Sequence, residues 1–92
     1  MNRGELIATV AQETGYTQKQ VGEVLSSALG TIVNAVAGGQ KVLLVGFGSF
    51  EPRDRQAKNG RNPKTGESIK IAATRVPGFS AGSEFKKKVK NG

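Results

Sequence analysis

The residues of this sequence with the clearest chemical capacity form a basic stretch at positions 53–75. It holds seven basic side chains against two acidic ones, Asp54 and Glu67. Guanidinium and ammonium groups bind phosphate oxygens, so the stretch predicts contact with a nucleic-acid backbone. On a strand, Arg53 and Arg55 share one face, whereas Lys58 belongs to the other. The basic residues of the stretch are Arg53, Arg55, Lys58, Arg61, Lys64, Lys70 and Arg75.

A proline lies in the middle of this stretch, in the segment GRNPKTGES at positions 60–68. Gly60, Asn62-Pro63 and Gly66 are turn-forming residues, so they predict a reversal of the chain. The residue types leave two interpretations of Pro63 open. Either its ring presets φ for the turn, or it is a rigid apolar wedge that enters between stacked base pairs.

The side chains that most enzymes need are missing. The chain has no histidine and no cysteine, which removes the commonest nucleophile–base pairs and metal ligands. Glu51 and Asp54 stand three positions apart on a predicted strand, so their carboxylates point to opposite faces. The segment GFGSF begins like a dinucleotide-binding loop, but Glu51 stands where the third glycine is required, and a strand follows. We therefore expect no enzyme activity, no cofactor and no bound metal.

Charge and size favour a binding protein that associates with itself. Residues 1–52 carry three basic and four acidic side chains, which gives a net charge of −1. Residues 53–92 carry eleven basic and three acidic side chains, which gives +8 and brings the whole chain to +7. The second part is therefore expected to meet an anionic partner. A single domain of 92 residues has a marginal core, and without cysteine we expect self-association to supplement it. No apolar run approaches the ~20 residues of a membrane span and the N-terminus does not resemble a signal peptide, which predicts a soluble intracellular protein without membrane partners.

Two helices are predicted in residues 1–39. Asn2 with Glu5, and Thr17 with Gln20, form capping-box patterns at their starts, and Gly15 suits the end of the first. The second helix carries an apolar stripe wider than the short first helix can cover, which again indicates a partner chain. The stripe consists of Val21, Val24, Leu25, Ala28, Leu29, Ile32, Val33 and Val36.

Strands and a last helix are predicted after residue 39. Residues 41–45 are predicted to form a short buried strand, and a second strand is predicted to start at Gly48. Segments 52–59 and 67–75 are expected to pair as a ribbon, with a disordered linker as the alternative. We expect Pro77-Gly78 to break the strand and Ser80 to cap the helix that follows. The predicted organisation is one domain with a helical base (1–39), a sheet core (40–52), a β-ribbon arm (53–75) and a C-terminal helix (76–92).

Four segments together resemble one known family. The chain resembles the HU/IHF family of bacterial histone-like DNA-binding proteins, and resembles HU more than IHF, because these segments agree in order and spacing along its whole length. The segments are MNRGELI, LVGFGSF, GRNPKTGE and ATRVPGFSAGSEFK. The resemblance implies an α+β fold: a helical dimerisation base, and a three-stranded antiparallel sheet extended into a β-ribbon arm. It also implies an intertwined dimer whose two arms embrace double-stranded DNA through the minor groove. The implied role is architectural, namely DNA bending, nucleoid organisation and chromosome compaction in the cytoplasm.

The resemblance also assigns roles to residues by position. Pro63 is the intercalating residue, and Arg3 and Lys86 are candidates for contact with flanking DNA. Two departures concern the starts of the second and third helices, where relatives often carry lysine and this chain has Gln18 and Ser83. They leave the length of DNA engaged and the bend open. The implied DNA-binding residues are Arg3, Arg53, Arg55, Lys58, Arg61, Asn62, Pro63, Lys64, Lys70, Arg75 and Lys86.

Sequence preference is expected to be weak, because the minor groove separates mainly A·T from G·C. Binding should follow deformability, with nicked, gapped or bent DNA preferred. Three alternatives stay open: a sequence-preferring IHF-like subunit, an RNA-binding module, and a protein- or membrane-interaction module based on the lysine-rich tail. The sequence does not separate a homodimer from a heterodimer with a related subunit.

Overall fold

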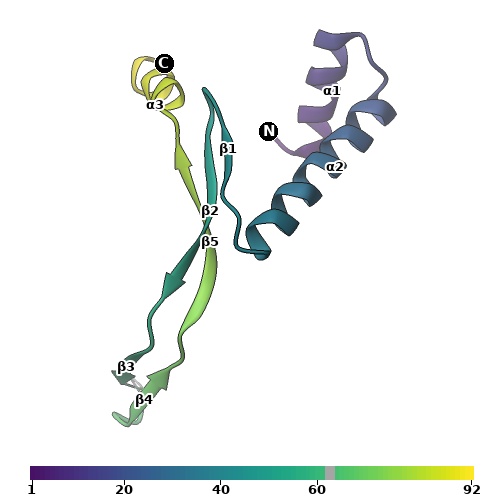
Figure 1. Ribbon diagram of the computed structural model, residues 1–92. Helices are drawn as coiled ribbons and strands as arrows, with labels where there is room; N and C mark the ends of the chain where they lie inside the picture. Colours follow the sequence, from purple (N-terminus) through teal and green to yellow (C-terminus); the bar gives the residue numbers. More distant parts are fainter. Residues whose placement is uncertain (62–63) are drawn as a thin grey trace. The chain divides into compact units, whose positions relative to one another are not determined.

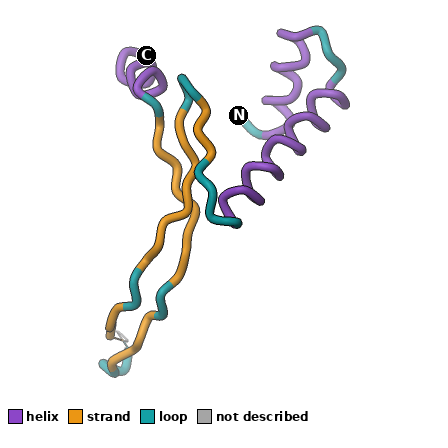
Figure 2. The backbone as a smooth tube through the Cα atoms, viewed as in Figure 1, coloured by secondary structure: helices purple, strands orange, loops and turns teal. Residues whose placement is uncertain are grey.

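The structure, a computed structural model, describes residues 1–61 and 64–92, with the backbone alone for Lys58, Ile69, Lys70 and Ile71. The chain divides into two compact units, residues 1–34 and 35–92. In Figures 1 and 2 the first unit is helical, and the second contains a long twisted β structure followed by a terminal helix. The elements are α1 (Arg3–Thr14), α2 (Gln18–Ala37), β1 (Val42–Leu44), β2 (Gly48–Arg55), β3 (Lys58–Arg61), β4 (Ser68–Ile71), β5 (Thr74–Ala81) and α3 (Ser83–Asn91).

The first two helices begin and end where local signals predict. The Asn2 side-chain oxygen accepts a hydrogen bond from the Glu5 amide at 2.9 Å, which satisfies one free N–H of α1. Gly15 follows α1 with φ of +79°, a left-handed conformation that glycine adopts without strain, and its N–H bonds to the Ala11 carbonyl. Thr17 and Gln20 form a reciprocal capping box at the start of α2, with distances of 2.9 and 3.1 Å.

Within the first unit, α2 lies against α1 at Gly22. A Cβ atom on Gly22 would lie 3.6 Å from Ile7 Cδ1, an ordinary van der Waals contact, so the packing of the two helices does not require a glycine there. Ala11 of α1 is buried, and so are Val21 and Val36 of the apolar stripe, but other members of the stripe are not. Val24 remains 70% exposed and Val33 64% exposed. The single chain therefore leaves much of the apolar stripe of α2 uncovered.

The second unit is built on a three-stranded antiparallel sheet in the order β1-β2-β5. β2 pairs with β5 along its whole length, from Gly48 opposite Ala81 to Arg55 opposite Thr74. β1 covers only the first part of β2, up to the pair of Val42 with Phe50. The prediction that this strand is buried was wrong, because Leu43 and Leu44 are exposed. Four half-exposed phenylalanine rings gather at this end, with centroids 4.8–6.3 Å apart. They are Phe47, Phe50, Phe79 and Phe85.

The predicted ribbon is confirmed and is longer than expected. β3 pairs with β4 from Lys58 opposite Ile71 to Arg61 opposite Ser68, in the same register as β2 with β5. The register is the same in every pair from Gly48–Ala81 to Arg61–Ser68. The pairing is therefore interrupted at 56–57 and 72–73 without the extra residue of a β-bulge. β3 and β4 therefore continue the two strands that leave the sheet.

Two predictions at the end of the sheet were wrong. β5 runs through Pro77-Gly78 to Ala81, because Pro77 faces Pro52 across the ladder at a level where β1 has already ended. In an antiparallel pair that exchanges no hydrogen bonds at that position, neither residue needs an N–H, so two prolines can face each other there. The residue that caps α3 is Gly82 and not Ser80, which lies in β5.

Candidate nucleic-acid interface

The paired strands β2 and β5 sort their side chains onto two faces, because neighbouring residues alternate. One face carries Phe50 opposite Phe79 and, farther along, Asp54 opposite Arg75. Arg75 Nε lies 3.3 Å from Asp54 Oδ1, with both side chains more than half exposed. This ion pair holds Arg75 across the ribbon, and solvent screening makes its contribution to stability small.

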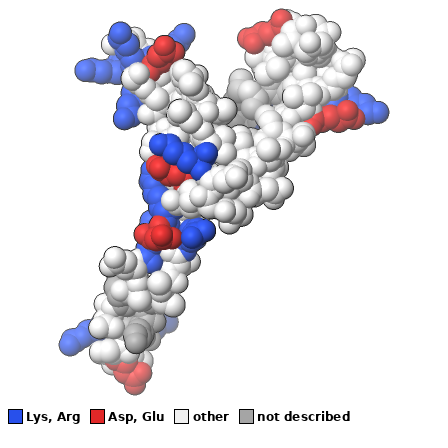
Figure 3. All heavy atoms as spheres, in the orientation of Figure 1, with Lys and Arg blue, Asp and Glu red and all other residues white. Residues whose placement is uncertain are grey.

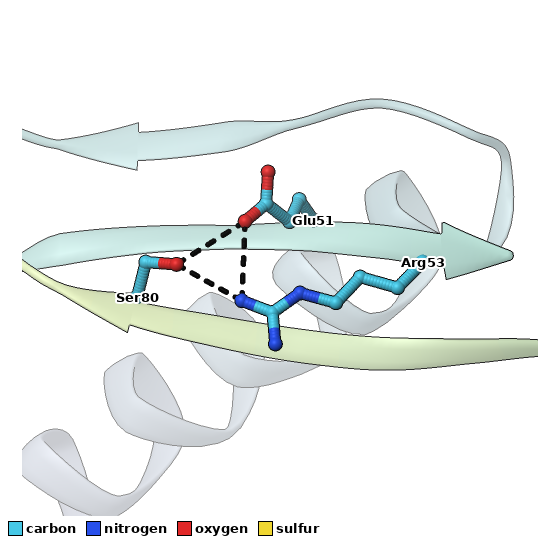
Figure 4. A network of polar contacts seen from close by, with 3 residues as sticks. All are labelled: Glu51, Arg53 and Ser80. Atoms are coloured by element: carbon cyan, nitrogen blue, oxygen red, sulfur yellow. Dashed lines mark hydrogen bonds and ion pairs between the residues drawn. The ribbon is translucent and has the colours of Figure 1, made fainter. Parts of the chain in front are cut away.

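The opposite face carries a polar network at the start of the ribbon. Arg53 Nη2 donates to Ser80 Oγ at 2.9 Å and to Glu51 Oε1 at 3.3 Å, and Ser80 Oγ lies 3.2 Å from the same carboxylate oxygen. Figure 4 shows the three side chains converging over the pair of strands. The hydrogen bond from Arg53, followed by that from Ser80, lowers the pKa of the Glu51 carboxyl below its ordinary value.

The network predicts an acid-sensitive contribution to stability. Because the folded pKa of Glu51 is depressed, its contribution to stability is complete above the unfolded pKa and is lost as pH falls through the folded pKa. Glu51→Gln removes the titrating group. We therefore expect the midpoint of thermal unfolding to fall less for Glu51→Gln than for the unsubstituted protein between pH 6 and pH 3, measured by circular dichroism. Equal decreases would contradict the role of Glu51.

The other cations of the ribbon differ in how they are held. Arg55 and Arg61 are exposed, and neither has a hydrogen bond or ion pair among the residues that the structure describes. Lys64 is exposed beyond β3. Lys58 and Lys70 lie at paired levels of β3 and β4, where Lys70 faces Asn59. Asn62 and Pro63, predicted for the tip, lie outside the described residues.

Two predicted contacts for flanking DNA lie in different units. In the first unit, Arg3 Nη2 donates to Ser26 Oγ at 2.6 Å and is 3.4 Å from the Gly22 carbonyl, so this guanidinium links α1 to α2. In the second, Lys86 is exposed on α3 with Lys87, Lys88 and Lys90. Figure 3 shows their blue side chains gathered on that helix. Gln18 and Ser83, the two departures from the family pattern, are the first residues of α2 and α3.

Sequence reasoning missed Ser80 and Glu51 as hydrogen-bond partners of Arg53. The contact with Ser80 depends on the register in which β2 pairs with β5, and that register is not a local property of the sequence. The available signal was the spacing of Glu51 and Arg53, which places both on one face of a strand.

Within the described part of the chain, no three acidic residues are close enough to hold a metal ion. No helix described there is long and apolar enough to cross a bilayer.

Comparisons with known proteins agree over nearly the whole chain. The family model described as "Bacterial DNA-binding protein" matches residues 1–90. A DNA-binding protein HU of Nostoc sp. is 58% identical over 89 residues, 97% of this chain and 95% of the relative. A DNA-binding protein HU-1 of Halalkalibacterium halodurans is 49% identical over 98% of this chain and its own full length.

Solved structures share the fold. A cocrystal structure of Anabaena HU with DNA superposes with a TM-score of 0.91 at 58% identity, covering 97% of both chains. HU from Thermotoga maritima gives a TM-score of 0.70 at 37% identity, covering 97% of this chain and 98% of the other.

Proposed function

The chain belongs to the family of bacterial DNA-binding proteins, and we propose that it binds double-stranded DNA largely without sequence preference and bends it. The observation that carries this proposal is the two-stranded ribbon whose described pairs keep one register from Gly48–Ala81 to Arg61–Ser68, and which carries exposed arginines along its length. The assignment of a binding protein and not an enzyme agrees with the family. A place in the bacterial nucleoid, in the cytoplasm, follows as part of the proposal.

Binding rests on phosphate contacts from the ribbon. A two-stranded ribbon is narrow enough to enter a groove, and its guanidinium groups then reach phosphates on the groove walls. Arg55 and Arg61 supply exposed cations without partners in the described part of the chain, and Lys58, Lys64 and Lys70 add charge at the same end. These contacts position the protein but carry no sequence information, so binding is broad.

Bending rests on a wedge and on two arms. Pro63 stands at the turn of the ribbon in the sequence, and a rigid apolar residue there enters between base pairs and kinks the duplex. A second copy of the chain supplies the second ribbon, and the uncovered stripe of α2 supports such a dimer. Arg3 and the lysines of α3, including Lys86, then meet DNA on either side of the bend.

Preference among DNA forms follows from the cost of deformation. Unstacking a base step costs a few kcal/mol, and a nick, a gap or an existing bend has already met part of that cost. The aromatic residues argue against single-stranded RNA as the ligand, because stacking on aromatic rings is its usual mode of recognition. All four phenylalanines lie between residues 47 and 85 at the sheet end of the ribbon, and Tyr16 lies in the first unit.

The test is a gel-shift titration with intact, nicked and four-way-junction DNA and with duplex RNA of equal length. We expect nicked and junction DNA to bind tighter than intact DNA. Duplex RNA should bind least, because its major groove is too deep and narrow to be read by side chains and its minor groove is wide and shallow. The affinity should fall steeply with salt, by about 0.9 in the log–log slope for each phosphate contact.

Charge removal gives the matched control for that titration. Arg55→Gln with Arg61→Gln should lower the salt slope by about two for each chain, while Lys41→Gln, an exposed cation outside the proposed interface, should leave it unchanged. A flat salt titration, or tighter binding of RNA than of nicked DNA, would overturn the proposed function. Strong preference for one DNA sequence would favour an IHF-like subunit.

A further inference from the structure

Among the described arginines of the ribbon, Arg53 is the one whose side chain crosses from its own strand to the paired strand and lies over a glycine there. Its side chain leaves β2 and crosses to β5 over Gly78, which faces Glu51 in the ladder. A Cβ atom built on Gly78 would lie 2.5 Å from Arg53 Cζ and 2.6 Å from Cδ, and closer still to Nε. Arg53 therefore fills the space that any other residue at position 78 would need.

The end of the same side chain is held by two acceptors. Ser80 Oγ and Glu51 Oε1 both bind Nη2, at 2.9 and 3.3 Å. Nη1 has no hydrogen-bond partner among the described residues, and the side chain is 51% exposed. One nitrogen of the guanidinium is thus fixed to the protein, while another is left to bind an anion from solution.

Arg53 differs in this respect from Arg55 and Arg61, whose side chains have no hydrogen-bond partner in the described structure. A long side chain that must be ordered on binding costs affinity, and a side chain already held in place avoids that cost. Glu51 acts in the opposite direction, because its negative charge repels an approaching phosphate. Ser80 and Gly78 carry no charge, so their contribution is position alone.

From these observations we propose that Gly78 and Ser80 are positioning residues of the DNA interface, which hold Arg53 across β5 and direct its Nη1 to a DNA phosphate at the start of the ribbon. The inference rests on the proposed function and adds to it a specific geometry. It explains why a glycine follows Pro77 inside a strand, where glycine is otherwise unfavourable.

Gly78→Ala is the direct test, because the added methyl group meets only the flexible side chain of Arg53 among its nearest atoms. We expect DNA affinity to fall about three- to tenfold, the change expected when one long side chain must be ordered on binding. The salt slope should fall toward that of Arg53→Gln, and thermal unfolding should change little. Gly30→Ala, where a Cβ meets nothing within 4 Å, is the control for the same chemical change and should leave affinity unaltered.

A double-mutant cycle separates positioning from a general effect on the fold. In the Arg53→Gln background, Gly78→Ala should cause no further loss, because there is no guanidinium left to displace. Ser80→Ala adds no volume and removes one acceptor, so it should weaken binding in the same direction whether or not Gly78→Ala folds. Glu51→Gln keeps an acceptor oxygen and removes a negative charge, so its affinity should equal or exceed that of the unsubstituted protein.

The outcomes distinguish this inference from the proposed function. Additive losses in the cycle, or unchanged binding by both Gly78→Ala and Ser80→Ala, would overturn the positioning role. So would unchanged binding by Arg53→Gln while Arg55→Gln and Arg61→Gln weaken it, and in that case the proposed function would stand. Only a failure of the unsubstituted protein to bind DNA would remove both.

Discussion

Pro63→Ala is expected to remove most of the bend in a short DNA duplex while retaining most of the affinity. In the proposed function, affinity comes mainly from phosphate contacts along the ribbon, and these do not require the proline. The proposed source of the bend is the wedge, which costs a few kcal/mol of base unstacking at each kinked step. Energy transfer between dyes at the two ends of a duplex of about 30 base pairs, at saturating protein, measures the bend separately from the affinity.

Further substitutions distinguish the wedge from the turn. Pro63→Leu restores a bulky apolar group without fixing φ, so a wedge predicts that leucine recovers much of the bend. If Pro63 serves only the turn, alanine and leucine should behave alike. Pro77→Ala is the matched control: it removes a proline from β5, away from position 63, and should leave the bend in place. A duplex that stays equally bent with Pro63→Ala would contradict the wedge.

Features set by neighbouring residues were predictable from the sequence. The capping residues Asn2 and Thr17 were identified from their spacing to Glu5 and Gln20, because a cap involves only residues three apart. The antiparallel ribbon was also predicted, since turn-forming residues separate the segments 52–59 and 67–75. The three-stranded sheet and its α+β setting agree with the fold of solved HU structures.

Features set by pairing across the chain were not predictable in the same way. Pro77-Gly78 was expected to end a strand, because both residues disfavour strands on average. The strand continues because Pro77 pairs with Pro52, at a position that needs no N–H. Gly78 pairs with Glu51, and the side chain of Arg53 occupies the space beside Gly78 where a Cβ atom would lie. Ser80 has the type of a helix cap but lies two residues too early, so its hydroxyl group joins the network of Glu51 and Arg53.

The same limit applies to the candidate site. The basic residues could be found from charge alone, but their partners could not. Arg75 was predicted for DNA contact and is held by Asp54, and Arg3 is held by Ser26. Both pairings depend on residues about twenty positions apart, which only the folded chain brings together. The structure therefore adds to the sequence a distinction between cations that are already positioned and cations that remain without partners.

Besides the wedge at Pro63, the proposed function requires a dimer, and the apolar stripe of α2 is its proposed interface. It borders a groove of about 670 Å³ in the first unit, lined by apolar side chains that include Leu6, Val10 and Val24. Val24, at 70% exposed, would tolerate a lysine if the chain worked alone. If a second copy covers the groove, the same substitution places a charge in a core, twice in each symmetric dimer.

Val24→Lys is therefore expected to abolish the dimer and, with it, tight DNA binding. Two buried valines at about 1.5–3 kcal/mol each correspond to a rise in the dimer dissociation constant of about 10²- to 10⁴-fold. Sedimentation equilibrium across a concentration series measures that constant, and the gel shift measures binding by the same samples. Asn34→Lys adds the same charge on the opposite face of α2, where the side chain is exposed, and should leave both measurements close to the original. If Val24→Lys still forms dimers of normal affinity, the stripe is not the interface. If the unsubstituted protein sediments as a single chain while it bends DNA, one ribbon is sufficient and the two-arm arrangement is wrong.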